Sequence, residues 1–318
     1  MGGVLVDADT DRRDYNGLPI YDRKSVTEKF DSFNVILGHS RYELGEHIKE
    51  QIPNINKVFY AFSVSYKQYD KVPYSEIEQN ADRFVKLCND VADEQFVKNL
   101  LAYLNTKMTG DVSYIFDVYE KQMNFYNNDV FKVTQEEVLY DIGAYDGDTI
   151  RLFLEETDGK YKKIIALEPD DKSFLELNDY VAKNRMPDVI TSKMGAWNCT
   201  ADLKFESGNE QLSSVSVDGE SSKPENFITI YAERIDKIFD EPATCIKINY
   251  LDGVFEAIEG CEGIIRKYLP KLVMDVGFEI YNVLKLYEYI KGLDLGYKFY
   301  LRFNRAMTSP FTLYAVTK

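Results

Sequence analysis

The C-terminal half of the chain alternates short apolar runs with stretches of helical periodicity. Seven apolar runs predict strands at 138–142, 164–167, 189–196, 245–249, 272–276, 297–301 and 312–316. Helical stretches separate the first five strands and are expected at 149–156, 171–183 and 254–268. A segment of hairpin character runs from 203–205 through 228–230. This order predicts an α/β sheet of seven strands whose last two form an antiparallel edge.

The first 62 residues predict a small parallel, Rossmann-like α/β unit. Strands are expected at 4–7, 34–37 and 57–62, with a helix through Leu44, Ile48 and Ile52. Residues 16–20 predict a turn that leads into an extended segment. The unit begins with Met1-Gly-Gly directly before a strand and lacks the glycine-rich turn that normally opens such a unit. We therefore expect a unit that is truncated or has lost its ligand.

Residues 63–136 are predicted to be mainly helical and to connect this unit to a sheet domain over 137–318. One apolar helical face is formed by Phe96, Val97, Leu100, Leu101 and Leu104. Three tyrosines follow, and they are Tyr114, Tyr119 and Tyr126. We expect them either to pack between domains or to form the lid or wall of a site for a sugar-like substrate, because aromatic faces suit such ligands.

The segment from Val138 to Thr149 carries the most specific chemistry. An apolar strand runs through Asp141 into a turn that contains Gly143 and Gly147, and a helix follows. The next strand ends in Glu168-Pro169. Glycines let the backbone turn tightly against a ligand, and an acid at the end of the second strand can accept hydrogen bonds from both ribose hydroxyls. This layout predicts a nucleotide-binding βαβ unit.

The spacing of the turn distinguishes between nucleotides. A dinucleotide site requires G-x-G-x-x-G, so that a pyrophosphate can bind bare helix N–H groups. Tyr145 stands where a phosphate binder needs a small residue, and Asp146 and Asp148 would repel a pyrophosphate. The same carboxylates suit a ligand that carries an amine and a sulfonium. The turn therefore favours S-adenosylmethionine over NAD, and it disfavours an NAD-dependent oxidoreductase or a sugar-nucleotide enzyme.

Composition excludes several classes of function. The net charge of −15 repels phosphate backbones and no basic cluster offsets it, so nucleic acid is not the expected substrate. There is no apolar run of about eighteen residues and no signal segment, which predicts a cytoplasmic protein without a membrane span. The four cysteines are scattered without a C-x-x-C pair, which favours lone buried thiols over disulfides or zinc.

Several motifs together resemble those of FkbM-family S-adenosylmethionine-dependent methyltransferases. They are Asp141-Ile-Gly-Ala-Tyr-Asp-Gly-Asp-Thr149, Leu167-Glu-Pro-Asp170, Met194-Gly-Ala-Trp197, Ser213-Ser-Val-Ser216, Ile246-Lys-Ile248, Tyr268-Leu-Pro-Lys-Leu272 and Tyr297-Lys-Phe-Tyr-Leu-Arg302. The resemblance covers roughly residues 130–318. It implies a seven-stranded Rossmann-like class I methyltransferase sheet, S-adenosyl-L-methionine as cofactor, and O-methylation of a sugar, glycan or small natural product.

The resemblance also implies roles on the cofactor side. Asp141 would fix the turn or contact the methionine amine. Gly143, Ala144 and Gly147 would bring the backbone close to the methionine part, and Glu168 would hold the ribose hydroxyls. The other expected cofactor contacts are Tyr145, Asp148, Thr149, Pro169, Gly195, Ala196 and Trp197. The last three lie where the adenine edge rests, and Trp197 either contacts the adenine or packs in the core.

The catalytic side departs from the family pattern. The fourth strand of relatives typically ends Lys-Ile-Asp-x-Glu-Gly-x-Glu, whereas this chain has Lys247-Ile-Asn-Tyr-Leu-Asp-Gly-Val254. Asn249 thus replaces the first acid, and Asp252 keeps one carboxylate, displaced by one position. Phe278 and Phe303 stand where relatives often carry histidine.

Histidine and metal chemistry are therefore not expected at the site. Both histidines, His39 and His47, lie in the N-terminal unit, and His47 is expected on a solvated helix surface. The sheet domain thus has no imidazole to act as a base near neutral pH. It also shows no set of His, Asp and Glu with metal-ligand spacing near the fourth strand.

Two alternatives follow from these substitutions. In the first, the enzyme is active, Asn249 orients a small-molecule or glycan acceptor, and Asp252 or Glu279 takes its proton. Methyl transfer from a sulfonium depends largely on proximity and alignment, so a weak base suffices. In the second, the chain is a catalytically degenerate methyltransferase-fold protein that binds S-adenosylmethionine or a partner. Four aromatic residues would make the acceptor side suit a less polar molecule or a stacked sugar ring, and they are Tyr250, Phe278, Tyr281 and Phe303.

Overall fold

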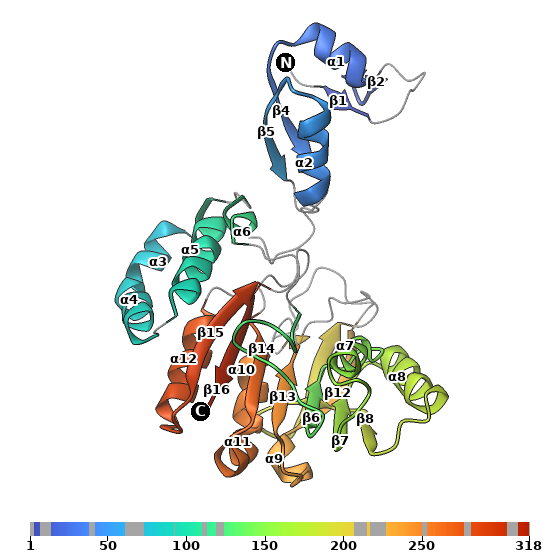
Figure 1. Cartoon of the computed structure of the whole chain (residues 1–318), viewed down its shortest axis with the longest axis vertical. Coiled ribbons are helices and arrows are strands. Elements are labelled where there is room, and N and C mark those ends of the chain that lie inside the picture. The colour runs from blue at the N-terminus through green and yellow to red at the C-terminus, as the bar shows by residue number, and fades with distance from the viewer. Residues whose placement is uncertain are drawn as a thin grey trace.

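The computed structural model describes most of the chain. The described residues are 3–6, 14–37, 42–60, 73–91, 93–109, 113–118, 124–206, 215–216, 227–249, 253–276, 281–303 and 311–317. Along the chain they form an N-terminal α/β unit, a helical segment and a C-terminal sheet flanked by helices (Figure 1). The domain boundaries at residues 62 and 136 stay predictions.

The C-terminal part is built on a seven-stranded sheet. In sheet order its strands are β15 (Lys298–Phe303), β16 (Phe311–Val316), β14 (Lys271–Asp275), β13 (Cys245–Ile248), β6 (Val138–Ile142), β7 (Lys163–Leu167) and β8 (Val189–Ser192). The run from β14 to β8 is parallel, and β16 is antiparallel to both of its neighbours. The predicted α/β sheet of seven strands with an antiparallel edge pair is confirmed.

Helices cover both faces of this sheet because alternate strand residues point to opposite sides. Tyr140 and Ile142 of β6 belong to the same hydrophobic cluster as α10 (Val254–Gly260), α11 (Glu262–Tyr268) and α12 (Asn282–Gly292). Leu139 packs instead on the other face with α7 (Asp148–Glu156) and α8 (Asp171–Lys183). Figure 1 shows α7 and α8 toward the β8 end of the sheet. The first two strands and their turn thus lie between two packed helical layers.

Two predicted elements of this part are divided in the structure. The predicted helix 254–268 is broken at Cys261 into α10 and α11, and α12 between β14 and β15 was not predicted. The predicted strand 189–196 ends at Ser192 in the main sheet, because the chain turns there and the Met194 N–H donates to the Ser192 carbonyl at 3.1 Å. Gly195–Ala196 then forms β9 of a second sheet.

The second sheet confirms the predicted hairpin. Its order is β11 (Val215–Ser216), β10 (Ala201–Glu206), β12 (Phe227–Glu233) and β9. β10 and β12 are antiparallel, with Leu203 opposite Ile230, whereas β9 runs parallel to β12. A short helix, α9 (Ile235–Ile238), follows β12. This sheet holds residues that the sequence placed at the end of the third strand of the main sheet.

The N-terminal unit contains the expected parallel strand pair. Its elements are β1 (Val4–Leu5), β2 (Asp14–Tyr15), β3 (Leu18–Tyr21), α1 (Arg23–Lys29), β4 (Phe33–Leu37), α2 (Tyr42–Gln51) and β5 (Ile55–Tyr60). β4 and β5 pair in parallel, while β2 and β3 form an antiparallel hairpin. The predicted turn is confirmed, since Asn16 and Gly17 both have positive φ between these strands. Val26, Ile52 and Ile55 form the core of the unit.

The helical segment covers the edge of the main sheet. It contains α3 (Tyr74–Gln79), α4 (Ala81–Asp90), α5 (Glu94–Thr109) and α6 (Ser113–Phe116). Phe96, Leu100 and Leu104 of α5 are buried as predicted, but Leu101 is 51% exposed because the buried face turns toward Tyr103 instead. Asn99 of α5 donates to the Leu301 carbonyl of β15 at 2.7 Å, so the helix satisfies part of an edge strand.

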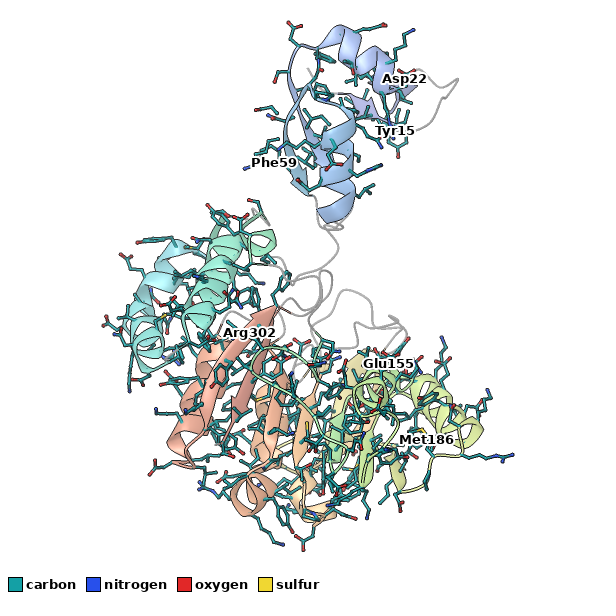
Figure 2. The ribbon with its side chains drawn as sticks, viewed as in Figure 1. Tyr15, Asp22, Phe59, Glu155, Met186 and Arg302 are labelled. Carbon is teal, nitrogen blue, oxygen red and sulfur yellow. The ribbon has the colours of Figure 1, made fainter. Side chains whose placement is uncertain are left out.

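Arg302 of β15 joins this segment to the rest of the fold (Figure 2). Its guanidinium contacts Asp93, which precedes α5, at 2.5 Å and Asp129 at 2.7 Å, and its side chain is only 2% exposed. Asp129 belongs to residues 124–131, which we call the strap. The strap crosses the face of the sheet that α7 covers, since Phe125, Tyr126 and Phe131 share its hydrophobic cluster.

The remaining predictions about side chains have mixed outcomes. Of the three tyrosines, Tyr114 is partly exposed, Tyr126 is fully buried in the core, and Tyr119 lies outside the described residues. Cys245 and Cys261 are buried free thiols, but Cys199 is exposed, because it lies on the surface turn before β10, so the prediction of buried thiols is wrong there. None of the helices in the described ranges has the length and apolarity to cross a bilayer.

Candidate cofactor site at the glycine turn

The turn between β6 and α7 keeps a glycine-type backbone although its middle position is a tyrosine. Gly143, Tyr145 and Gly147 have φ values of 76°, 49° and 89°. For Tyr145 this left-handed conformation costs about 1–2 kcal/mol. A Cβ added to Gly147 would lie 2.9 Å from the Tyr180 ring, so close packing as well as φ requires glycine there. The N–H groups of Gly143 and Ala144 both donate to the Leu167 carbonyl at 3.0 Å, which holds the turn over the end of β7.

A buried ion pair fixes the start of this turn. The Lys247 ammonium of β13 lies 2.8 Å from one oxygen of Asp141, 2.9 Å from the Gly143 carbonyl and 3.1 Å from the Thr149 hydroxyl. The Thr149 hydroxyl donates to the other Asp141 oxygen at 2.7 Å. Burial raises the pKa of Asp141, and the Lys247 ammonium and the Thr149 hydroxyl oppose that rise. The geometry matches the turn-fixing alternative for Asp141.

Lys247 lies within the motif Ile246-Lys-Ile248, but the sequence predicts no role for it. Its side chain is 1% exposed, and that of Asp141 is 0% exposed. A lysine inside the otherwise apolar strand β13 could have predicted a buried ion pair, because a buried ammonium is almost always paired.

The turn carries two other acids, Asp146 and Asp148. Asp146 is paired with Arg151, whose Nη2 lies 2.7 Å and 2.9 Å from the two carboxylate oxygens. Asp146 thus has a positively charged partner, and the expectation that Asp146 and Asp148 repel a pyrophosphate stays a prediction. Asp148 opens α7, and one of its carboxylate oxygens accepts from the Thr149 N–H at 2.7 Å. Asp148 thus places negative charge at the first turn of the helix, where it is stabilised.

Glu168 lies directly beside the turn. One carboxylate oxygen accepts from the Tyr145 N–H at 2.8 Å and the other from the Asp170 N–H at 2.9 Å. The residue is 6% exposed, and burial raises the pKa of its carboxyl to about 7. The neighbouring Pro169 is also buried. Each Glu168 oxygen has a further lone pair, so a diol can donate to this carboxylate without displacing the two backbone donors.

Gly195, Ala196 and Trp197 follow the end of β8 but pair with the second sheet. Gly195 is opposite Ala232 and Ala196 is opposite Glu233. Trp197 is 9% exposed and shares a cluster with Leu203, Ile230 and Ala232 of the second sheet.

The surroundings of Trp197 match the packing alternative. A Cβ on Gly253, the residue before α10, would lie 2.6 Å from the Trp197 ring. A Cβ on Gly260, at the end of α10, would lie 2.0 Å from the Trp197 carbonyl oxygen. The tryptophan therefore fills the contact between the second sheet and α10.

The proposed catalytic residues are only partly within the described ranges. Asn249 follows β13, is half-buried, and donates its N–H to the Ile142 carbonyl at 3.0 Å, beside the turn. Asp252 and Glu279 lie outside the described residues, as do Tyr250 and Phe278. Within the described part of the chain, no group of three or more His, Cys, Asp or Glu side chains is arranged to hold a metal ion.

Three further side chains named by the sequence are placed by the structure. Phe303 is 2% exposed and packs on Phe311 at 5.1 Å between ring centroids. It belongs to the core cluster, with α5 against β15, and its place on the acceptor side stays a prediction. Tyr281 is half-buried against Phe84 of α4. His47 is on an exposed part of α2 and contacts Gln51 at 2.6 Å, as expected for a surface residue.

Comparisons with known proteins find likenesses in structure but none in sequence. No protein-family model matches the chain, and no curated protein matches its sequence. The chain is similar to the methyltransferase FkbM from Methylobacillus flagellatus KT, with a TM-score of 0.71 and 19% identity over 94% of this chain and 78% of that chain.

Two other solved structures are similar more loosely. An rRNA methylase from Streptococcus thermophilus has a TM-score of 0.36 and 14% identity over 58% of this chain and 89% of that chain. Aeropyrum pernix fibrillarin in complex with natively bound S-adenosyl-L-methionine has a TM-score of 0.37 and 11% identity over 59% of this chain and 70% of that chain. Both likenesses extend over little more than half of this chain.

The likeness to the FkbM methyltransferase establishes the fold. It extends over nearly the whole chain, so it includes the seven-stranded sheet and the glycine turn between β6 and α7. The resemblance that the motifs indicated is thus confirmed at the level of the fold. The chain has the α/β fold of a class I methyltransferase, with a seven-stranded Rossmann-like sheet.

Proposed function

We propose that this protein is an S-adenosylmethionine-dependent methyltransferase that O-methylates a sugar, a glycan or a small natural product. The observation that carries the proposal is the contact between Glu168 and the glycine turn. The Glu168 carboxylate accepts from the Tyr145 N–H at 2.8 Å, so the acid at the end of β7 and the turn at the end of β6 form one site. A nucleoside ribose and the group attached to it fit such a pair of features.

The charges of the site support a cationic ligand. Asp141 pairs with Lys247 and Asp146 with Arg151, and Asp148 adds a third carboxylate at the first position of α7. The cofactor, when bound, supplies a sulfonium-linked methyl group that an acceptor oxygen can attack as the carbon–sulfur bond breaks. The protein has to hold the acceptor in line and take up one proton.

Asn249 is the described residue best placed for the acceptor. It follows β13 directly, next to the strand that leads into the turn, and its N–H bonds the end of β6. An amide can orient a hydroxyl through hydrogen bonds but cannot take its proton. We assign that proton to Asp252 or Glu279. The net charge of −15 favours a small or glycan acceptor over nucleic acid, and we propose that the protein acts in the cytoplasm.

The test is calorimetric titration with S-adenosylhomocysteine of the wild-type chain, Glu168→Ala and Glu176→Ala. Glu176 lies exposed on α8 and serves as the matched control. We expect micromolar binding by the wild type and the control, and affinity about 10–100-fold weaker for Glu168→Ala, from the loss of hydrogen bonds to a charged acceptor. Equal affinity of all three chains would refute the assignment of Glu168. Absence of binding by the wild type would refute the proposed function.

The second candidate is a protein of this fold that binds the cofactor without methyl transfer. Asn249 favours it, because an amide stands where relatives have an acid. Incubation with S-adenosylmethionine and a panel of hydroxyl acceptors distinguishes the two candidates. Formation of S-adenosylhomocysteine that depends on one acceptor supports the enzyme. Tight cofactor binding with no such product across sugars, glycans and phenols supports the degenerate protein.

A further inference from the structure

Asn124 and Asn127, on either side of Tyr126, hold the backbone of the strap. Asn124 and Asn127 each donate a side-chain N–H to the Glu156 carboxylate of α7, both at 2.6 Å. The Asn124 side-chain oxygen also accepts from the N–H groups of Tyr126 and Asn127, both at 2.7 Å. This side of the strap is therefore fixed to the helix that begins at the glycine turn.

The other side of the strap is anchored as firmly. The Asn128 side-chain oxygen accepts from the N–H groups of Val130 and Phe131 at 3.1 Å and 2.9 Å. Asp129 forms a two-pronged contact with Arg302, at 2.8 Å and 2.7 Å. Tyr126 lies between these two anchors, so the position of its ring is defined on both sides by the same segment.

The Tyr126 ring is enclosed beside the glycine turn. The residue is 0% exposed and shares a hydrophobic cluster with Ala144 of the turn and with Ile150 and Phe153 of α7. Its ring meets that of Phe153 edge-on, with centroids 5.5 Å apart and an interplanar angle of 71°. The ring itself is thus accounted for by packing.

The hydroxyl of Tyr126 is not accounted for by packing. Among the described residues nothing donates to it or accepts from it. Buried polar groups are almost always hydrogen-bonded, so an orphan hydroxyl points to a partner that arrives from elsewhere. Burial raises the pKa of this phenol, and Asp141, Cys245 and Asp148 are among the groups that raise it further. Both oxygens of Asp141 already have partners, in Lys247 and Thr149.

We propose that the Tyr126 hydroxyl is a binding residue for the amino-acid end of the cofactor, and that it gains its hydrogen-bond partner only when that end is bound. An ammonium can donate to the phenol oxygen, and the nearby carboxylates favour a cation at that place. The inference rests on the proposed function and extends it, because no sequence motif had assigned Tyr126 to the cofactor.

The test compares Tyr126→Phe with Tyr140→Phe by calorimetry. Tyr140 is also a fully buried tyrosine, but its hydroxyl donates to the Glu241 carbonyl at 3.1 Å, so it is the matched control with a satisfied hydroxyl. Two ligands are used, namely S-adenosylhomocysteine and 5′-methylthioadenosine, which lacks the amino-acid end. We expect Tyr126→Phe to bind S-adenosylhomocysteine about ten-fold or more weakly, as for a lost hydrogen bond to a charged group, with unchanged affinity for 5′-methylthioadenosine. Tyr140→Phe should bind both ligands like the wild type.

Thermal unfolding without ligand gives the second readout. Removing an unpaired hydroxyl should leave the Tm of Tyr126→Phe equal to or above that of the wild type, whereas Tyr140→Phe should melt lower. The inference is overturned if Tyr126→Phe binds S-adenosylhomocysteine like the wild type, if it loses both ligands equally, or if its ligand-free Tm falls as for Tyr140→Phe. A wild-type chain that binds neither ligand would overturn the proposed function itself, and the inference with it.

Discussion

The pair of Lys247 and Asp141 allows the sharpest test of how the turn is held. Lys247→Met removes an ammonium that contacts Asp141, the Gly143 carbonyl and the Thr149 hydroxyl, all within 3.1 Å. Removing one partner of a buried ion pair leaves the other charge uncompensated and costs about 3–5 kcal/mol. Natural domains have total stabilities of about 5–15 kcal/mol, so the loss is a large fraction of the whole. Asp141→Asn should cost a similar amount, since it leaves the ammonium without its carboxylate.

The double variant tests whether the losses of the two single variants are coupled. Lys247→Met with Asp141→Asn removes both charges of this pair, so its loss of stability should be smaller than the sum of the single losses by on the order of 2 kcal/mol. Urea unfolding gives the free energy of unfolding of all three chains, and the fluorescence of Trp197, the single tryptophan, follows the transition. Exposed Lys183→Met, whose partner Asp179 is 3.3 Å away, is the control and should change stability by less than about 0.5 kcal/mol.

The pair also predicts a pH dependence for the single variant. Burial raises the pKa of Asp141, and Lys247→Met removes the ammonium that opposes that rise. A carboxyl whose pKa is raised in the folded state stabilises the fold below its unfolded pKa, and this stabilisation is lost as the pH rises through the folded pKa. The deficit of Lys247→Met should therefore grow from about pH 4 toward neutral pH. Additive single losses, or a deficit that does not depend on pH, would refute the reasoning.

Three further predictions concern the neighbourhood of the turn and the strap. Burial raises the pKa of Glu168 from 4.5 to about 7. The contribution of this carboxyl to ligand-free stability is therefore present below pH 4.5 and lost as the pH rises through 7. Glu168→Gln should flatten the dependence of Tm on pH over that window. Gly147→Ala should lower the free energy of unfolding, measured in urea, by about 1–3 kcal/mol, and by more than Gly159→Ala does. Both glycines have positive φ, but only at Gly147 would the new Cβ have the Tyr180 ring within 4 Å. Arg302→Lys should cost about 1–3 kcal/mol in the same assay, since one ammonium cannot bridge two carboxylates as the guanidinium does.

The outcomes that would contradict these predictions are distinct. A Glu168→Gln chain with the same pH slope as the wild type would show that another group titrates in that window. Equal losses for the two glycine variants would leave only backbone strain and no role for the Tyr180 ring. An Arg302→Lys chain as stable as the wild type would mean that one carboxylate contact is enough to hold the strap.

Local sequence patterns determined the elements and the turn chemistry. Apolar runs and helical periodicity placed all seven strands of the main sheet, and 171–183 was predicted to the residue as α8. Gly143, Gly147 and Glu168 were identified because a turn conformation and a strand end depend on neighbouring residues in the chain. The departures lie where neighbours along the chain do not decide the result, as at Gly195–Ala196, which pairs with β12 rather than continuing β8.

Tertiary structure alone decided what each site residue contacts. Lys247 reaches Asp141 across 106 positions of sequence, and Arg302 reaches Asp93 across 209. Trp197 packs against a glycine before α10, and Phe303 is buried because α5 covers β15. Such contacts depend on which strands are adjacent and which helix covers them, and a single sequence carries no local signal for either. The sequence by itself thus determined the strands of the main sheet and the glycine turn, while only the folded chain decided which charges are paired, which ring is core and which buried hydroxyl has no partner among the described residues.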